Sequence, residues 1–238
     1  MWESRLGGSH GPRKYMKRGK KYQAAIVKVD RNKTYPVEEA IKFVKENKSA
    51  KFDESVEIHI KTNIDPKKSD QSVRGTVVLL HGTGKSKKIA VITSTSAAEA
   101  EKAGADIVGG EELIDKISKK INFDVLVATP EMMPKLAKIA KILGPKGLMP
   151  NPKTETVTTK IRETVEALKK GKASFKNDDT GNIHQVIGKV SFEENKLAEN
   201  IKIFLENVSK VKPGGLKGKL ISSATICSTM GPGIKINT

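Results

Sequence analysis

The strongest constraint on the fold is a hydrophobic pattern that changes twice along the chain. Between about residues 83 and 171, apolar strand-like segments alternate with amphipathic helical ones. The strands are KKIAVIT, ADIVG and FDVLVAT, and the helices are SAAEAEKAG, EELIDKISKK, PEMMPKLAKIAKIL and TVTTKIRETVEALKKG. Such alternation is typical of a sheet built from βαβ units with parallel strands.

The segments on either side have a different style. FDESVEIHIKTNI alternates apolar and polar residues, with Val56, Ile58 and Ile60 on one face, and VRGTVVLL predicts a second strand. KASFKNDDTGNIHQVIGKV predicts two strands joined by a turn, FEENKLAENIKIFLENVSKV a helix, and KGKLISSATICSTMGPGIKI a closing strand. We therefore predict a host domain of residues 1–82 and 172–238 with a domain inserted at 83–171. Residues 1–10 are set apart as a tag or disordered leader.

The charge distribution indicates the class of partner. The chain has 44 basic and 27 acidic residues, a net charge of +17. Residues 83–171 hold 16 basic and 11 acidic residues, so the outer segments hold 28 and 16, a balance of +12. An excess of this size favours a polyanion, nucleic acid first and an anionic membrane surface second. No apolar run is long enough to span a membrane.

The sequence contains no complete motif for catalysis or metal binding. Cys227 is the only cysteine, and it could act as a nucleophile only beside a base; the four histidines lack metal-ligand spacing. Asp178 and Asp179 fall in a turn, where carboxylates usually cap their own backbone. HGTGKSKK ends like a phosphate-binding loop, but Leu79 stands where that motif requires glycine and a strand follows. We expect no catalytic residue, metal or cofactor.

One segment, ILGPKGLMPNP at residues 142–152, resembles the signature of the large-subunit ribosomal protein L1 family. By itself it predicts a rigid corner, with a helix ending at Gly144 and three prolines stiffening the chain. The resemblance extends, in the family's order and spacing, from about Gly19 to Asn237. Its other blocks are KFDESVEIHIKTNIDPKKSDQSVRGT, AGADIVGGEELI, FDVLVATPEMM, FKNDDTGNIH and STMGPGIKIN.

The resemblance implies a fold and a function. The fold is α/β with two domains: an α+β split-sandwich host domain made from both chain ends and an inserted Rossmann-like domain. The function is structural and non-catalytic. Such proteins bind large-subunit ribosomal RNA, form the mobile side stalk near the exit site for deacylated tRNA, contact other ribosomal components, and often repress their own operon by binding its mRNA. The expected location is the ribosome, in the cytoplasm or an organelle.

The resemblance also implies which residues contact RNA. They match Lys51, Phe52, Ser55, Ser223, Thr229, Met230 and Gly231. Lysine can pair with phosphate, an aromatic ring can lie against a base or ribose, and hydroxyls can bond the 2′-OH. Without the resemblance, Phe52 and Met230 would be interpreted as core residues. Asp179 stands where the family has lysine, and we expect Lys172 and Lys176 to compensate.

Two alternatives remain at this stage. The inserted domain could bind a nucleotide in an enzyme, but its first strand-to-helix connection, TSTSAAEAEK, lacks the glycines of a dinucleotide-binding turn. The chain could instead be a basic membrane adaptor, but it lacks a cationic amphipathic helix with aromatic anchors.

Overall fold

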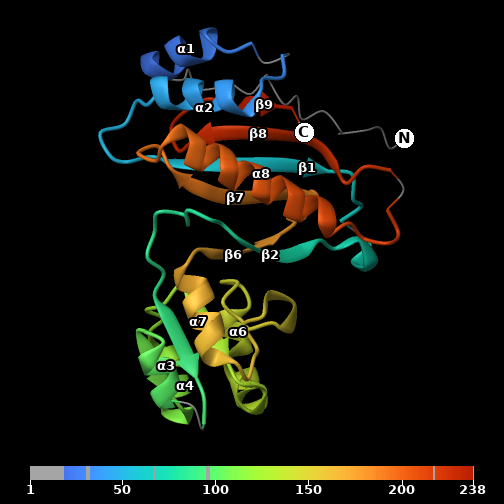
Figure 1. The fold of residues 1–238 in the computed structure, drawn as a ribbon. Coiled ribbons are helices and arrows are strands. Elements are labelled where there is room, and N and C mark those ends of the chain that lie inside the picture. The colour runs from blue at the N-terminus through green and yellow to red at the C-terminus, as the bar shows by residue number, and fades with distance from the viewer. Residues whose placement is uncertain (1–18, 31–32, 67, 95–96, 217, 238) are drawn as a thin grey trace, which may run out of the picture.

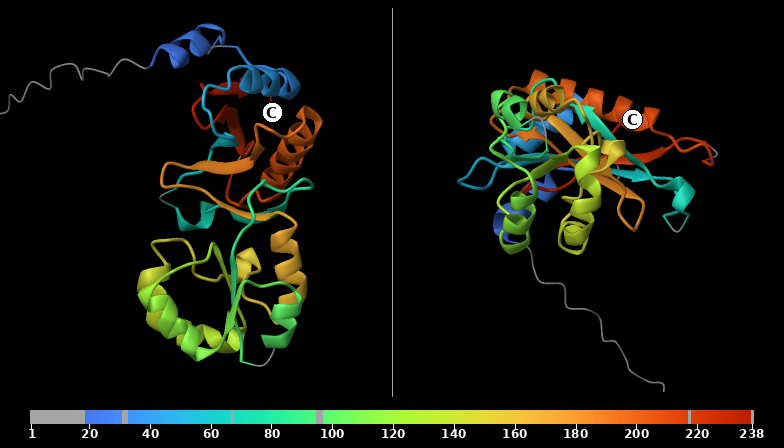
Figure 2. Two further views of the ribbon diagram at one scale, coloured as in Figure 1. Left: turned by 90° about the vertical axis from the view of Figure 1, so that its left-hand side faces the viewer. Right: turned by 90° about the horizontal axis from the view of Figure 1, so that it is seen from below.

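The structure is a computed structural model that describes residues 19–30, 33–66, 68–94, 97–216 and 218–237 (Figure 1). The predicted leader at residues 1–10 lies outside the described residues. The helices and strands of the described residues form one larger and one smaller body joined by a thin ribbon of two strands (Figures 1 and 2). The chain is thus of mixed α/β class, as predicted.

The larger body is built on a four-stranded antiparallel sheet with the order β7-β1-β8-β9. Its strands are β7 (Asn182–Lys189), β1 (Ser55–Thr62), β8 (Ile221–Ser228) and β9 (Ile234–Ile236). Two helices in mutual contact, α2 (Val37–Glu46) and α8 (Glu194–Lys210), pack on this sheet. They cover only one face of the sheet. Ile58 and Ile60 of β1 and Phe204 of α8 are therefore fully buried, while alternate strand residues such as His59 stay accessible.

The smaller body contains a parallel sheet with the order β4-β3-β5. Its strands are β3 (Ile89–Ile92), β4 (Ile107–Gly109) and β5 (Val125–Ala128). Its main helices are α3 (Ala97–Lys102), α4 (Glu111–Lys119) and α7 (Ile161–Lys169). All four residues of β3 are fully buried, as expected for a parallel strand covered on both faces.

The ribbon pairs β2 (Arg74–Val78) with β6 (Lys172–Lys176), so it joins a strand before the smaller body to a strand after it. The two segments that connect the larger and the smaller body, at Gly82 and Gly171, lie against each other. Gly171 has a φ of 108°, and a Cβ added there would lie 2.6 Å from the Gly82 Cα. The Leu79 N–H also donates to the Gly171 carbonyl oxygen at 3.5 Å. The chain therefore leaves and re-enters the larger body at one point, where only glycine fits.

The apolar core is divided in the same way. One cluster of buried residues draws only on residues 29–79 and 173–236. Two further clusters lie on the two faces of the parallel sheet and draw only on residues 89–168. This distribution supports the division into a host domain of 1–82 plus 172–238 and an insert of 83–171, which we keep as a proposal.

Two local predictions, for the segment at residues 130–143 and for the closing strand, were wrong. PEMMPKLAKIAKIL is not one helix but η2 (Pro130–Met132), α5 (Met133–Leu136), η3 (Ala137–Ile139) and α6 (Ala140–Leu143). Pro134 lacks the N–H that would continue a helix from η2, which separates η2 from α5. The prediction of two strands joined by a turn in residues 172–189 is confirmed, although the two strands pair with different partners, β6 with β2 and β7 with β1. The closing strand is two strands, β8 and β9, separated by a turn. The sequence did not predict the first helix of the structure, α1 (Lys20–Val27).

The corner at ILGPKGLMPNP agrees with its prediction. α6 ends at Leu143 with Gly144 as its C-cap, and Gly147 has a φ of 69°. Pro152 then begins the short η4 (Pro152–Thr154), which contacts β2 of the ribbon. The segment therefore returns the chain from the smaller body to the junction.

We predict that a short glycine linker can replace residues 83–171. Loop-closure entropy changes by only about 0.6 kcal/mol per doubling of length, and the host has its own core. The truncated chain should unfold in one cooperative transition in urea, monitored by circular dichroism. A truncated chain without a cooperative transition, while the full chain keeps one, would show that the host depends on the insert.

Candidate nucleic-acid interface

Two turns lie side by side at one end of the four-stranded sheet. β1 begins at Ser55 and the antiparallel β8 ends at Ser228, with Val56 opposite Ser228. The Ser55 N–H donates to Thr229 Oγ1 at 3.0 Å, and the Thr229 N–H donates to the Ser55 carbonyl oxygen at 3.1 Å. The segment before β1 and the turn after β8 are therefore joined by their backbones.

A buried carboxylate connects these turns. Glu54 has no exposed surface. Its Oε1 accepts from the N–H groups of Ser49 at 3.1 Å and Ala50 at 2.9 Å, and its Oε2 accepts from the Met230 N–H at 3.2 Å. The Ser228 hydroxyl also donates to it. Burial by itself raises the pKa of Glu54, but these hydrogen bonds outweigh it and hold the pKa below 4.5.

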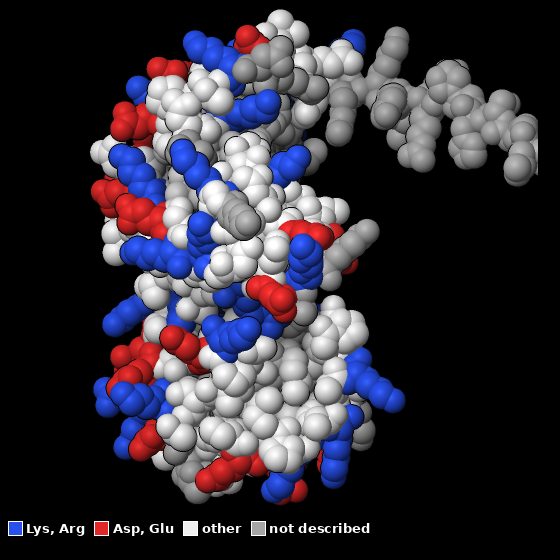
Figure 3. Space-filling view, turned by 90° about the vertical axis from the view of Figure 1, so that its right-hand side faces the viewer, with Lys and Arg blue, Asp and Glu red and all other residues white. Residues whose placement is uncertain are grey.

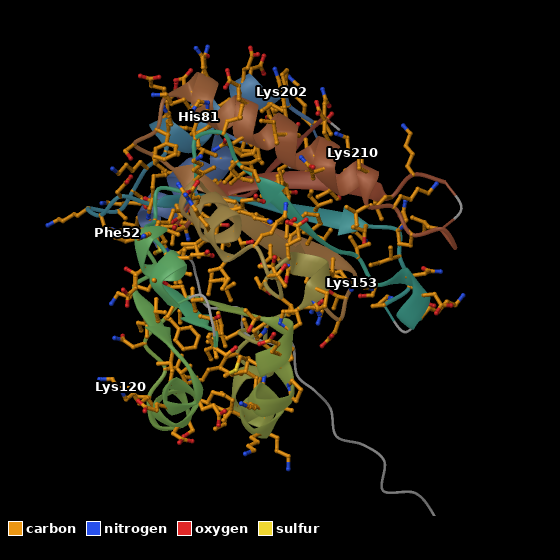
Figure 4. All side chains as sticks on the ribbon, turned by 60° about the horizontal axis from the view of Figure 1, so that its bottom comes forward. Phe52, His81, Lys120, Lys153, Lys202 and Lys210 are labelled. Atoms are coloured by element: carbon orange, nitrogen blue, oxygen red, sulfur yellow. The ribbon has the colours of Figure 1, made fainter. Side chains whose placement is uncertain are left out.

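Large apolar side chains are exposed on both turns. Phe52 is 53% exposed and Met230 is 55% exposed, and Phe52 lies at the periphery of the molecule in Figure 4. The side chains of Lys51 and Thr229 beside them are also exposed. We call these four residues, Lys51, Phe52, Thr229 and Met230, the turn-pair surface. The Phe52 ring can stack on a base and the Lys51 ammonium group can pair with phosphate, while the Thr229 hydroxyl is bonded to Ser55 and helps to hold the turn.

Ser55 and Gly231 have internal roles at this site. Ser55 is buried, and its hydroxyl accepts a hydrogen bond from Lys189 Nζ at 3.0 Å. A Cβ added at Gly231 would lie 2.6 Å from Ser228 Oγ, a hydroxyl engaged by Glu54. Both residues therefore support the turns. Sequence reasoning missed Glu54 and Lys189, because neither has a recognisable partner until the strands are paired.

The structure does not bring the other candidates to this surface. Ser223 lies opposite Lys61 at the far end of β8, about 20 Å from Thr229 at about 3.3 Å per residue. Lys172 is buried and forms an ion pair with Glu155 at the junction. Lys176 lines a cleft on the ribbon. RNA contact by these three residues stays a prediction.

The turn at residues 178–181 contains both predicted carboxylates. Asp178 accepts from the N–H groups of Thr180 at 2.9 Å and Asn182 at 2.6 Å, which confirms that it caps its own backbone. These bonds, led by that from Asn182, hold the pKa of Asp178 well below its usual range. Asp179 is exposed.

The single cysteine does have a neighbouring base. His59 Nε2 lies 3.1 Å from Cys227 Sγ. However, burial and the nearby Glu57 raise the pKa of the Cys227 thiol to about 11, so it is protonated at neutral pH and a poor nucleophile. Burial also lowers the pKa of His59.

Neither a metal site nor a membrane-spanning helix is found within the described part of the chain. No group of three or more histidine, cysteine or carboxylate side chains there has the arrangement of a metal site. No helix among those residues is both long and apolar enough to cross a membrane. Residues 84–88 run into the strand β3, so the phosphate-loop-like segment does not open a helix.

Comparison with known proteins identifies relatives along nearly the whole chain. Residues 44–232 match the model of the ribosomal protein L1p/L10e family. The chain is 52% identical over 219 residues to large ribosomal subunit protein uL1 of Mycoplasma capricolum, covering 91% of this chain and 97% of the relative. It is 54% identical over 224 residues to the uL1 protein of Onion yellows phytoplasma, covering 93% and 97%. It is 52% identical over 223 residues to that of Kosmotoga olearia, covering 93% and 96%.

We predict that Glu54→Gln lowers the free energy of unfolding by about 1–3 kcal/mol at neutral pH, because the amide cannot accept all four hydrogen bonds. The pKa of Glu54 is depressed in the folded protein, so its contribution is full above the ordinary value of 4.5 and is lost as the pH falls through the folded pKa. The difference between parent and variant should therefore shrink in acid. Urea unfolding at neutral pH and at about pH 3 measures it.

The matched control is Glu57→Gln, a partly exposed carboxylate on β1, three residues further along the chain. It should change stability little at either pH. A stability difference for Glu54→Gln that stays constant with pH would show that the carboxylate is not ionised in the folded protein.

Proposed function

The chain belongs to the ribosomal protein L1p/L10e family, and from that premise we propose that its turn-pair surface binds large-subunit ribosomal RNA. Its relatives are proteins of the large ribosomal subunit, and the chain is a structural, non-enzymatic component of the same kind. The observation that carries the proposal is the placement of Phe52 and Met230. Two large apolar side chains are held out to solvent on adjacent turns beside basic groups.

The chemistry of this surface suits RNA better than it suits a protein partner. The ring of Phe52 can stack on an unpaired base, and Met230 offers a flat apolar contact beside it. Lys51 precedes Phe52 in the chain. Lys189 Nζ lies in the same region and donates to the Asp53 carbonyl oxygen at 3.2 Å and to the Ser55 hydroxyl. Both ammonium groups can pair with phosphates. The net charge of +17 favours the approach of a polyanion.

We also propose the finer roles that the family resemblance implies. The protein forms the mobile side stalk near the exit site and assists release of deacylated tRNA there. It represses its own operon by binding a site on its mRNA. One RNA-reading surface can serve both the ribosomal RNA and the mRNA if the two present the same unstacked bases and phosphates.

We expect Phe52→Ala and Met230→Ala each to weaken binding to large-subunit ribosomal RNA by about 1–3 kcal/mol, the usual range for a specific contact. Both side chains are exposed, so stability should change little. Filter binding at fixed salt measures the affinity, and thermal unfolding confirms the fold. Leu80→Ala is the control, since Leu80 is 66% exposed outside the turn-pair surface. Parent-like affinity in both folded variants would remove this surface from the binding site.

A further inference from the structure

A cleft of about 230 Å³ lies where the ribbon faces the smaller body. Arg74, Ser174 and Lys176 line it from β2 and β6, and Leu148, Met149 and Asn151 line it from the ILGPKGLMPNP corner. Figure 3 shows Lys and Arg side chains gathered at the waist between the two bodies. Lys153 of η4 lies beside this region in Figure 4. The turn-pair surface contributes none of the lining residues.

Two cations stand directly opposite each other on the ribbon wall. Arg74 and Lys176 are register partners in the antiparallel pair of β2 and β6. Directly opposed side chains have Cβ atoms about 4.5–5.5 Å apart, and like charges in this arrangement are destabilising. Among the described residues, neither Arg74 nor Lys176 forms an ion pair. Their repulsion is therefore uncompensated by the protein.

The neighbouring charges leave the cleft positive. Lys172, four residues before Lys176, is neutralised by Glu155. Asp124 also lines the cleft, but its Oδ2 accepts the Lys88 N–H at 2.9 Å. Two cations against one engaged carboxylate leave a net positive charge in a partly enclosed space, where charges interact more strongly than in open water.

The opposite wall is rigid. The Asn151 Oδ1 accepts the Lys153 N–H at 2.8 Å, and the Asn151 N–H donates to Thr156 Oγ1 at 2.8 Å. Thr154 Oγ1 donates to the Asn151 carbonyl oxygen at 3.0 Å. These bonds fix the end of the proline-rich corner across from Arg74 and Lys176. The corner is thus one wall of a preformed basic cleft.

We propose that this cleft binds a phosphate group, held by Arg74 and Lys176. A guanidinium offers a planar pair of donors and an ammonium a compact charge, and together they match the several oxygens of a phosphate. The phosphate comes either from the backbone of bound RNA or from a free phosphate. The inference goes beyond the proposed function, since it involves no residue of the turn-pair surface.

The test is a titration of the full-length ¹⁵N-labelled protein with inorganic phosphate, with chloride adjusted to keep ionic strength constant. We expect saturable amide shifts at Ser174, Lys176 and Asn151 in the parent. They should disappear in the double variant Arg74→Gln/Lys176→Gln and persist in Lys202→Gln, which removes an exposed lysine of α8. Circular dichroism confirms that each variant folds.

An RNA arm identifies the source of the phosphate. If the ligand is an RNA phosphate, bound RNA will block the shifts, and the double variant will reduce the slope of log affinity against log salt by about 1. If it is a free phosphate, the shifts persist with RNA bound and the slope is unchanged. Met230→Ala should keep the phosphate shifts even where RNA binding is lost, so failure of the proposed function is distinguishable. Absence of saturable shifts in the parent, or the same shifts in the double variant, would overturn the inference.

Discussion

The buried carboxylate of Glu54 is the interaction on which the proposed RNA surface depends. A buried charge is costly unless hydrogen bonds replace its water. Here the replacement comes from Ser49 and Ala50 on one turn and from Ser228 and Met230 on the other. Neither turn alone satisfies the carboxylate, so the two are held in one arrangement. The backbones that carry the exposed Phe52 and Met230 are thereby held together, so they lose little conformational freedom on binding.

The junction is the second constraint on function. The chain crosses from the larger to the smaller body through two touching glycines, Gly82 and Gly171, beside the β2–β6 ribbon. So narrow a connection separates the two cores and leaves a cleft between them. The turn-pair surface is at one end of the four-stranded sheet, and the basic cleft is at the ribbon. A long, folded RNA could therefore meet the protein at two separate places.

Strong periodicity made much of the fold predictable from sequence. The apolar stripe on α8 and the alternation in β1 each indicate an element buried on one face, and the fully apolar β3 indicates a strand buried on both faces. Pairing partners were not predictable, because alternation shows which face is buried but not which strand lies alongside. The pairing of β6 with β2, and not with the neighbouring β7, was therefore not predicted.

The candidate site was predictable only in its exposed members, and these came from the family resemblance. Glu54 lies between Asp53 and Ser55, and a local reading of three polar residues indicates a solvated turn. Its burial depends on Met230, 176 residues away in the chain. Ser55 is buried and bonded to Lys189 across the β1–β7 pair, and its contact with RNA stays a prediction. Long-range pairing decides these roles, and no local pattern records it.

The most direct test of the central claim is the RNA affinity of Glu54→Gln. Glu54 has no exposed surface and cannot touch RNA. If it acted only through its charge, removing that charge would strengthen binding to a polyanion. We predict the opposite: affinity for large-subunit ribosomal RNA falls by about 1–3 kcal/mol in the folded variant, because the two turns separate. Glu57→Gln, which removes a charge but none of the hydrogen bonds that join the two turns, should bind no more weakly than the parent. Parent-like or tighter binding by folded Glu54→Gln would contradict the account.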